Sequence, residues 1–151
     1  MVRDVTSELA IALQNARLPF RLCGALLFGS TARRNTTADS DIDLLVVAEG
    51  INPKLHRRGE EIFLIKKSLP LLTLDILLFT PEETRNNFEN HNPLFLDIAE
   101  DGVILLDHEN FLKGLVDGTL DYVRQNGISR LSDGWQFPVK ERSATFLSQV
   151  R

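Results

Sequence analysis

Asp41 and Asp43 lie two residues apart at the start of the apolar run 42–48. If this run is a strand, its alternating side chains place both carboxylates on the same face. Two neighbouring carboxylates repel each other unless a cation lies between them, and oxygen ligands of this kind are those that Mg²⁺ prefers. The spacing therefore predicts a magnesium site at the start of a strand.

A Gly29-Ser30 turn precedes this pair and follows a second apolar run, 22–28. The free backbone N–H groups and the hydroxyl of such a turn bind phosphate well, especially where Thr31 begins a helix. An ordinary turn followed by a solvated strand start is the alternative. We favour the chemical interpretation because the whole pattern, with a strand on each side, is rare by chance.

Asp75 is an acid inside a third apolar run, 71–79. A charge in a buried strand is costly unless it is paired or binds a metal ion. One alternative is an acid at a strand edge, paired with an Arg from a helix. The burial cost favours the other alternative, in which Asp75 completes a carboxylate triad with Asp41 and Asp43.

The periodicity of the chain predicts an α/β (α+β) fold, in which a small mixed sheet is flanked by helices. Thr80-Pro81-Glu82-Glu83 has the residues of a helix start. The last long helix is expected to be interrupted near Gly118 and to end at Asn126-Gly127. The expected strands are 22–28, 42–48, 71–79 and 103–106, and the expected helices are 2–16, a segment after Pro53, a segment from Thr80, 93–99 and 111–123.

Length and composition are those of a single globular domain. The chain has 151 residues, 43% of them hydrophobic, and a net charge of -4, which argues against a dedicated nucleic-acid binder. The lone Cys23 excludes an internal disulfide, and no run approaches a membrane span, so we expect a cytoplasmic protein. We assign residues 1–127 to the domain and residues 128–151, which include Trp135 and Phe137, to a C-terminal tail that packs on it or binds a partner.

The segments Phe28-Gly29-Ser30-Thr31-Ala32-Arg33 and Ser40-Asp41-Ile42-Asp43-Leu44, followed by Asp75, resemble the nucleotidyltransferase superfamily that includes DNA polymerase beta. Within it they are similar to the minimal nucleotidyltransferases of prokaryotes. The resemblance covers about residues 5 to 107. One departure is Arg34, which stands where the family usually has Gly.

This resemblance implies a catalytic triad and a nucleotide site. Asp41, Asp43 and Asp75 would be the catalytic residues and the ligands of Mg²⁺, with two ions expected. Gly29, Ser30 and Arg33 would bind the phosphates of ATP or another nucleoside triphosphate. The implied reaction transfers a nucleoside monophosphate to an acceptor hydroxyl, and Asp75 is the expected general base.

The small size of the chain helps to choose among the acceptors that the resemblance allows. Stand-alone members of this length are similar to antitoxins whose partner is a HEPN-domain toxin, so we expect transfer, with AMP from ATP favoured, to a hydroxyl of that toxin. The alternatives are a catalytically idle module that neutralises a partner by occlusion, and a transferase that acts on RNA ends or a small molecule. Homo-oligomerisation stays open.

Several further residues are interpreted without a chemical role. Tyr122 is expected on a helix face, and the aromatic pair of the tail is expected to pack rather than to stack on bases. The histidines His56, His91 and His108 are interpreted as surface residues, and the basic residues Lys54, Arg57, Arg58, Lys66 and Lys67 as the solvated face of a helix.

Overall fold

The computed structural model of the chain describes residues 5–29, 42–70 and 73–138. Ser30, Arg33, Arg34 and Asp41 lie outside these residues. The elements are α1 (Val5–Asn15), β1 (Arg21–Phe28), β2 (Ile42–Glu49), the 3₁₀ turn η1 (Leu55–Arg57), α3 (Gly59–Ser68), β3 (Leu74–Phe79), α4 (Pro81–Glu89), α5 (Pro93–Asp101), β4 (Val103–Asp107), the 3₁₀ turn η2 (His108–Asn110), α6 (Phe111–Gln125), β5 (Ser129–Leu131) and β6 (Gly134–Gln136).

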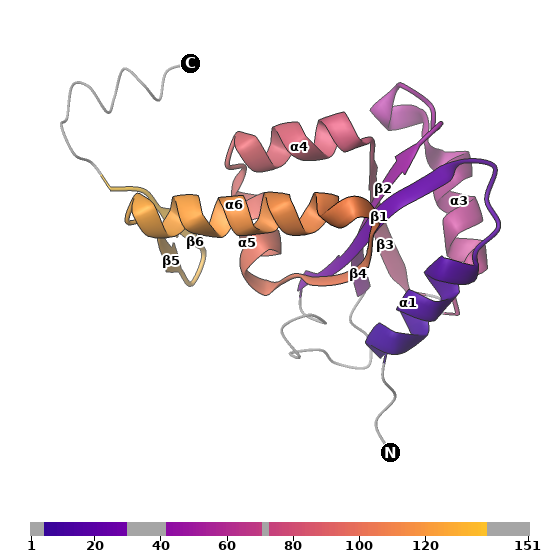
Figure 1. Ribbon diagram of the computed structural model, residues 1–151, viewed down its shortest axis with the longest axis horizontal. Helices are drawn as coiled ribbons and strands as arrows, with labels where there is room; N and C mark the ends of the chain where they lie inside the picture. The colour runs from indigo at the N-terminus through magenta and orange to yellow at the C-terminus, as the bar shows by residue number, and fades with distance from the viewer. Residues whose placement is uncertain (1–4, 30–41, 71–72, 139–151) are drawn as a thin grey trace.

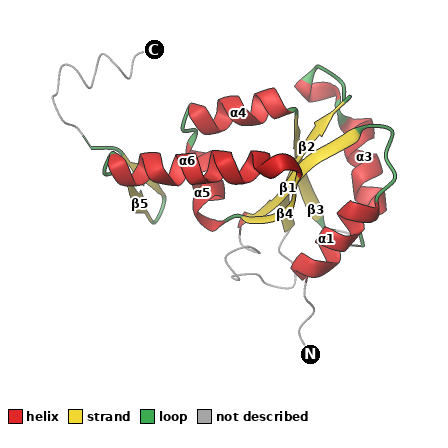
Figure 2. Cartoon of the chain, in the orientation of Figure 1, coloured by secondary structure: helices red, strands yellow, loops and turns green. Residues whose placement is uncertain are grey.

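Four of the strands form one mixed sheet in the order β3-β2-β1-β4. Strand β1 is antiparallel to both β2 and β4, whereas β2 and β3 are parallel. Helices cover both faces, with α1 and α3 on one side of the sheet and α4, α5 and α6 on the other (Figures 1 and 2). The expected α+β fold with a small mixed sheet is therefore confirmed.

The central strands are apolar because both of their faces are covered. Residues of β2 alternate between two cores: Leu44 and Val46 pack in the cluster that includes Leu9 of α1, whereas Leu45 and Val47 pack in the cluster that includes Phe95 of α5. This alternation fixes the register of β2, since a slip of one residue would exchange the two faces.

Helix α4 begins at the residue that the sequence indicated. Thr80 is its N-cap and Pro81 its first residue, and a capping box is complete: the Glu83 N–H donates to Thr80 Oγ1 and the Thr80 N–H donates to the Glu83 carboxylate. The third strand is shorter than expected and begins at Leu74, with residues 71–72 outside the described part of the chain.

Two expectations about the helices were wrong. Helix α6 runs without interruption through Gly118, because its other residues and two packed neighbours, α4 and α5, outweigh the weak helix propensity of its two glycines, Gly114 and Gly118. Arg58 is not on a solvated face: its side chain is 1% exposed, at the N-cap of α3. Lys54 and Arg57 precede this helix, around η1.

The Arg58 guanidinium joins three segments of the chain. It forms a bidentate ion pair with Glu83 at 2.7 and 3.1 Å, and it also donates to the carbonyl oxygens of Leu78 and Asn52. The buried charge is thus paired and hydrogen-bonded, which is the condition under which such burial is tolerated. Arg58 ties the loop before α3 to the end of β3 and the start of α4.

The described part of the tail folds back as a hairpin. Strands β5 and β6 pair with each other, and Ile128, which precedes them, is buried. Trp135 donates from Nε1 to Asp97 of α5 at 2.9 Å, and Arg130 forms ion pairs with Asp97 and Asp101. Residues 128–138 therefore pack on α5.

Candidate functional site

Three chain segments that the sequence singled out meet at one edge of the sheet. Strand β1 ends at Phe28, which pairs with Asp43 in the antiparallel β1–β2 ladder. Asp43 in turn pairs with Asp75 in the parallel β2–β3 ladder. The end of β1 and the starts of β2 and β3 are thus neighbours, and each brings one of the predicted residues to this edge.

The two carboxylates share a face of the sheet. Directly paired residues of neighbouring strands project the same way, with Cα atoms about 5 Å apart. Asp43 alternates with Leu45 and Val47, which pack against α4, α5 and α6, so the carboxylates lie on that face, at its uncovered edge. Asp43 is half-buried and Asp75 is exposed. The expectation that Asp75 is buried in its strand was therefore wrong: its side chain faces solvent, so no burial cost requires a partner or a metal ion there, and the pairing with Asp43 is what brings Asp75 to this site.

Gly29 packs directly against the Asp43 carboxylate. Its φ of +77° lies in the left-handed region, and a Cβ built on it would lie 2.2 Å from Asp43 Oδ2. A side chain at this position would displace the carboxylate. Gly29 therefore holds the space into which Asp43 extends, a role that the sequence did not reveal because it depends on how β1 and β2 pair.

These residues fit a divalent cation. Carboxylate oxygens side by side at a solvent-accessible edge are hard donors of the kind that bind Mg²⁺. Within the described residues no group of three or more His, Cys, Asp or Glu side chains is arranged to hold a metal ion. Asp41, the expected third carboxylate, lies outside these residues, as do Ser30 and Arg33 of the expected phosphate site.

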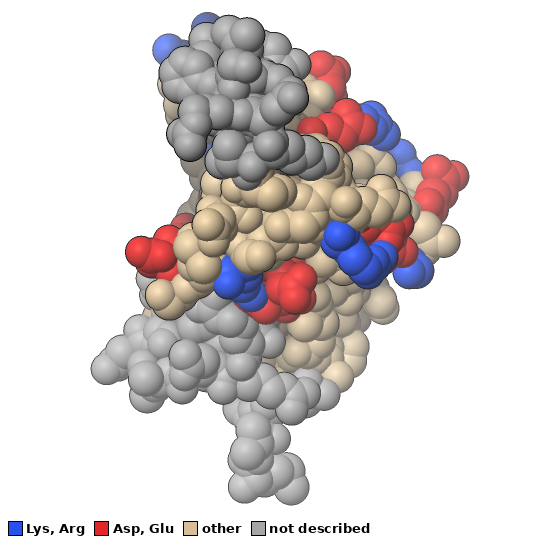
Figure 3. All heavy atoms as spheres, turned by 90° about the vertical axis from the view of Figure 1, so that its left-hand side faces the viewer, with Lys and Arg blue, Asp and Glu red and all other residues tan. Residues whose placement is uncertain are grey.

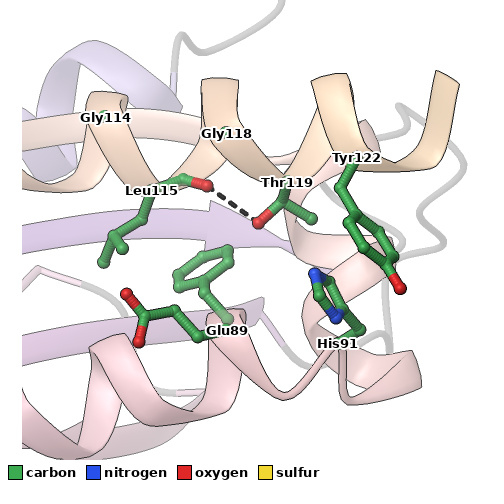
Figure 4. A pocket seen from close by; sticks show the side chains of 8 residues that line it. Glu89, His91, Gly114, Leu115, Gly118, Thr119 and Tyr122 are labelled. Carbon is green, nitrogen blue, oxygen red and sulfur yellow. Dashed lines mark hydrogen bonds between the residues drawn. The ribbon is translucent and has the colours of Figure 1, made fainter. Parts of the chain in front are cut away.

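A separate cavity of about 280 Å³ lies between α4 and α6 (Figure 4). At one end the rings of His91 and Tyr122 stack at a centroid distance of 3.6 Å, and the Thr119 hydroxyl donates to the carbonyl oxygen of Leu115. The lining residues are Phe88, Glu89, His91, Gly114, Leu115, Gly118, Thr119 and Tyr122, so the cavity includes neither Asp43 nor Asp75.

His91 corrects the interpretation of the histidines as surface residues. Its imidazole is half-buried against Tyr122, and this burial lowers the pKa of His91 below its ordinary value. No local pattern indicates this contact, because the two residues are 31 positions apart and meet only when α4 packs on α6. His56 and His108 are exposed, as expected, and Tyr122 lies on α6.

The chain matches the model of the nucleotidyltransferase domain family over residues 23–106. This match covers more than half of the chain and includes β1, β2, β3 and β4 with both described carboxylates. The protein therefore belongs to the nucleotidyltransferase domain family. No match was found among proteins of curated function.

Solved structures with a similar fold include toxin–antitoxin complexes. One is a toxin–antitoxin with AMP-PNP, at 14% identity over 97% of this chain and 98% of that one, with a TM-score of 0.46. Another is the MntA–HepT toxin–antitoxin, at 17% identity over 99% and 100% of the two chains and a TM-score of 0.45. A third is the tri-AMPylated HEPN toxin of Shewanella oneidensis in complex with the MNT antitoxin, at 15% identity over 97% of both chains and a TM-score of 0.45.

The helices that the structure describes include none that is both long and apolar enough to span a membrane.

Proposed function

We propose that this protein is a Mg²⁺-dependent nucleotidyltransferase that moves AMP from ATP to a hydroxyl group of a partner protein, and that this partner is a HEPN-domain toxin. Membership of the nucleotidyltransferase family supports the reaction class. The observation that carries the proposal is the register of Asp43 with Asp75, next to a glycine that leaves room for the Asp43 carboxylate.

The proposed division of labour among the carboxylates follows their positions. Asp43, together with Asp41, would hold Mg²⁺, which when bound neutralises negative charge on the triphosphate and on the pyrophosphate that leaves. Asp75 is exposed and lies beside Asp43. It can therefore reach an acceptor hydroxyl from solvent and take its proton.

In the proposed reaction the acceptor oxygen forms a bond to the α-phosphorus. The bond between the α-phosphorus and the oxygen that bridges it to the β-phosphorus breaks, and pyrophosphate leaves with that electron pair. The proton of the acceptor hydroxyl passes to the Asp75 carboxylate. The site otherwise positions the groups, as phosphoryl transfer requires.

The choice of a toxin as acceptor rests on the sequence resemblance to minimal nucleotidyltransferases. The similar toxin–antitoxin structures include one whose HEPN toxin carries AMP groups, and this is the partner chemistry that we carry to the present chain as a proposal. A nucleotide-labelling assay separates it from the alternatives.

The test is incubation of the purified chain with each α-³²P-labelled nucleoside triphosphate, Mg²⁺ and lysate of the source organism. We expect label from ATP on one protein band. Both EDTA and the Asp41→Ala/Asp43→Ala substitutions should abolish this labelling. Asp133→Asn is the matched control, since Asp133 is exposed in the turn between β5 and β6, and it should label normally.

Other results would overturn this proposal. Label on RNA or on a small molecule would identify a different acceptor class. No label from a folded protein, even with a purified HEPN-domain protein added as acceptor, would favour an idle module that acts by occlusion.

A further inference from the structure

The ends of α1 and α3 form an open groove on the face of the sheet opposite to the carboxylates. The groove has a volume of about 500 Å³. It lies on the α1–α3 side of the sheet, whereas Asp43 and Asp75 lie on the α4–α6 side. Its lining residues are Ala12, Asn15, Ala16, Arg17, Leu18, Leu64, Lys67 and Ser68.

Exposed apolar side chains lie one helical turn from lining residues of this groove on both helices. Ile11 lies one turn before Asn15 on α1 and is 59% exposed, and Phe63 lies one turn before Lys67 on α3 and is 61% exposed. Residues four apart lie on the same helix face. An apolar stripe on a docked amphipathic helix is the kind of surface that covers such side chains beside a groove.

Two cations that line the groove, Arg17 and Lys67, are exposed and form no ion pair with any residue that the structure describes. The same holds for Lys66, which precedes Lys67 on α3. By contrast, Lys113, Arg124 and Arg130 pair with Asp117, Asp121, Asp97 and Asp101. The part of the opposite face seen in Figure 3 shows basic and acidic side chains next to each other.

We propose that this groove, which we call the α1–α3 groove, docks an acidic amphipathic helix of a partner protein. An apolar stripe on that helix would cover Ile11 and Phe63, and its acidic residues would pair with Arg17 and Lys67. A second copy of this chain fits less well, because a two-fold interface through this face would bring the same cations of both copies together. RNA fits less well because the chain carries a net charge of -4.

The docked helix would leave the carboxylates open. The groove and the carboxylate pair lie on opposite faces of the sheet, so a partner held at the groove does not cover Asp75. If the docked protein is the acceptor of the nucleotide, this inference rests on the proposed function. In that case the α1–α3 groove holds the partner and the carboxylate site on the other face of the sheet modifies it.

The test measures binding without catalysis, by fluorescence anisotropy of a labelled peptide on the full chain. The probe is an amphipathic helical peptide of about 20 residues, long enough to span ~30 Å, with leucine on one face and glutamate elsewhere. A second probe has lysine in place of every glutamate. We expect the glutamate peptide to bind at least tenfold more tightly than the lysine peptide.

Variants of the full chain test whether the glutamate peptide binds at the α1–α3 groove. Arg17→Glu/Lys67→Glu should weaken the glutamate peptide at least tenfold, and Phe63→Ser several-fold. Lys54→Glu/Arg57→Glu is the matched control, because it makes the same change in net charge at exposed cations beyond the other end of α3, and it should leave the affinity within twofold. Asp43→Ala/Asp75→Ala should bind the peptide normally.

Several outcomes would overturn the docking inference. These are equal affinity for the two peptides, no binding of either, or an equal loss in the matched control. Preferential binding of a single-stranded RNA oligonucleotide that is lost in Arg17→Glu/Lys67→Glu, or a dimer in sedimentation velocity that this variant dissociates, would assign the groove to RNA or to a second copy. Peptide binding with these properties in a chain that labels no acceptor would leave the groove in place and remove the proposed function instead.

Discussion

The two ends of the β2–β3 strand pair differ in the charged residues that lie there: one has two carboxylates, and the other has a buried ion pair. At the start of the pair, Asp43 and Asp75 bring two like charges into register. Beyond the other end, Arg58 is buried in a bidentate pair with Glu83 and also donates to the carbonyl oxygen of Leu78 in β3. Breaking a buried pair of opposite charges destabilises a fold, whereas two neighbouring carboxylates at the surface indicate a site for a cation.

The largest expected effect concerns the end with like charges. Asp43→Ala/Asp75→Ala should lower the rate of nucleotide transfer by more than ~100-fold. Mutation of residues that only orient a metal ligand already lowers metal affinity or activity by about 10- to 100-fold. Transfer is measured with α-³²P-labelled ATP, and urea unfolding checks that the variant is folded. A folded variant that keeps its activity would refute this assignment.

At the other end of the strand pair, mutation of Arg58 should lower the stability of the fold. Arg58→Met removes the ion pair with the partly exposed Glu83 and the donors to the carbonyl oxygens of Leu78 and Asn52, and it should lower the free energy of unfolding by about 1–3 kcal/mol. Arg21→Met is the matched control: Arg21 pairs with Glu49 at 2.7 Å, but both side chains are more than half exposed, so a loss of only ~0–1 kcal/mol is expected. Equal losses in urea unfolding would show that the burial of Arg58 contributes nothing.

Gly29 allows a sharper test at the carboxylate end. Gly29→Ala should lower transfer by about 100-fold, because a misplacement of ~1 Å at a reacting centre has an effect of that size. Gly50→Ala is the matched control: Gly50 has a similar φ of +82°, but a Cβ there meets nothing closer than 3.6 Å. Both variants carry the cost of an alanine in the left-handed backbone region, about 1–2 kcal/mol. Only Gly29→Ala should lose activity, and an equal loss in both would assign the role of Gly29 to backbone strain alone.

The two ends also differ in how well the sequence predicts them. The starts of β2 and β3 follow from local patterns: apolar runs set the strands, and the two-residue alternation sets which side chains share a face. That Asp43 lies beside Asp75 depends on which strands pair, a long-range property. The sequence made this pairing plausible but did not determine its register.

The Arg58–Glu83 end was only half predictable. The capping residues of α4 lie within four positions of one another, so Thr80 and Glu83 were readable as a helix start. Arg58 lies 25 residues from Glu83, among other basic residues, and resembles them in sequence. Only the tertiary fold separates the one buried guanidinium from its solvated neighbours.

The smallest expected effect is the pH dependence of the stability that Glu83 contributes. Burial alone would raise the pKa of Glu83, but hydrogen bonds from Arg58 and from the Thr80 N–H outweigh it, so that the pKa of this carboxyl lies below its ordinary value of 4.5. A lowered pKa in the folded state means that the unfolded chain binds the proton more tightly. The stabilisation is therefore complete well above pH 4.5 and is lost as the pH falls through the folded-state pKa.

We expect the difference in free energy of unfolding between the wild type and Glu83→Gln to be largest near pH 7 and to shrink below pH 4.5. Because the Glu83 side chain is 32% exposed, solvent screening should keep this change to about 1 kcal/mol. Urea unfolding of both proteins between pH 3.5 and 7 measures it, and a difference that stays constant over this range would show that the ionised carboxylate is not what stabilises this end of the strand pair.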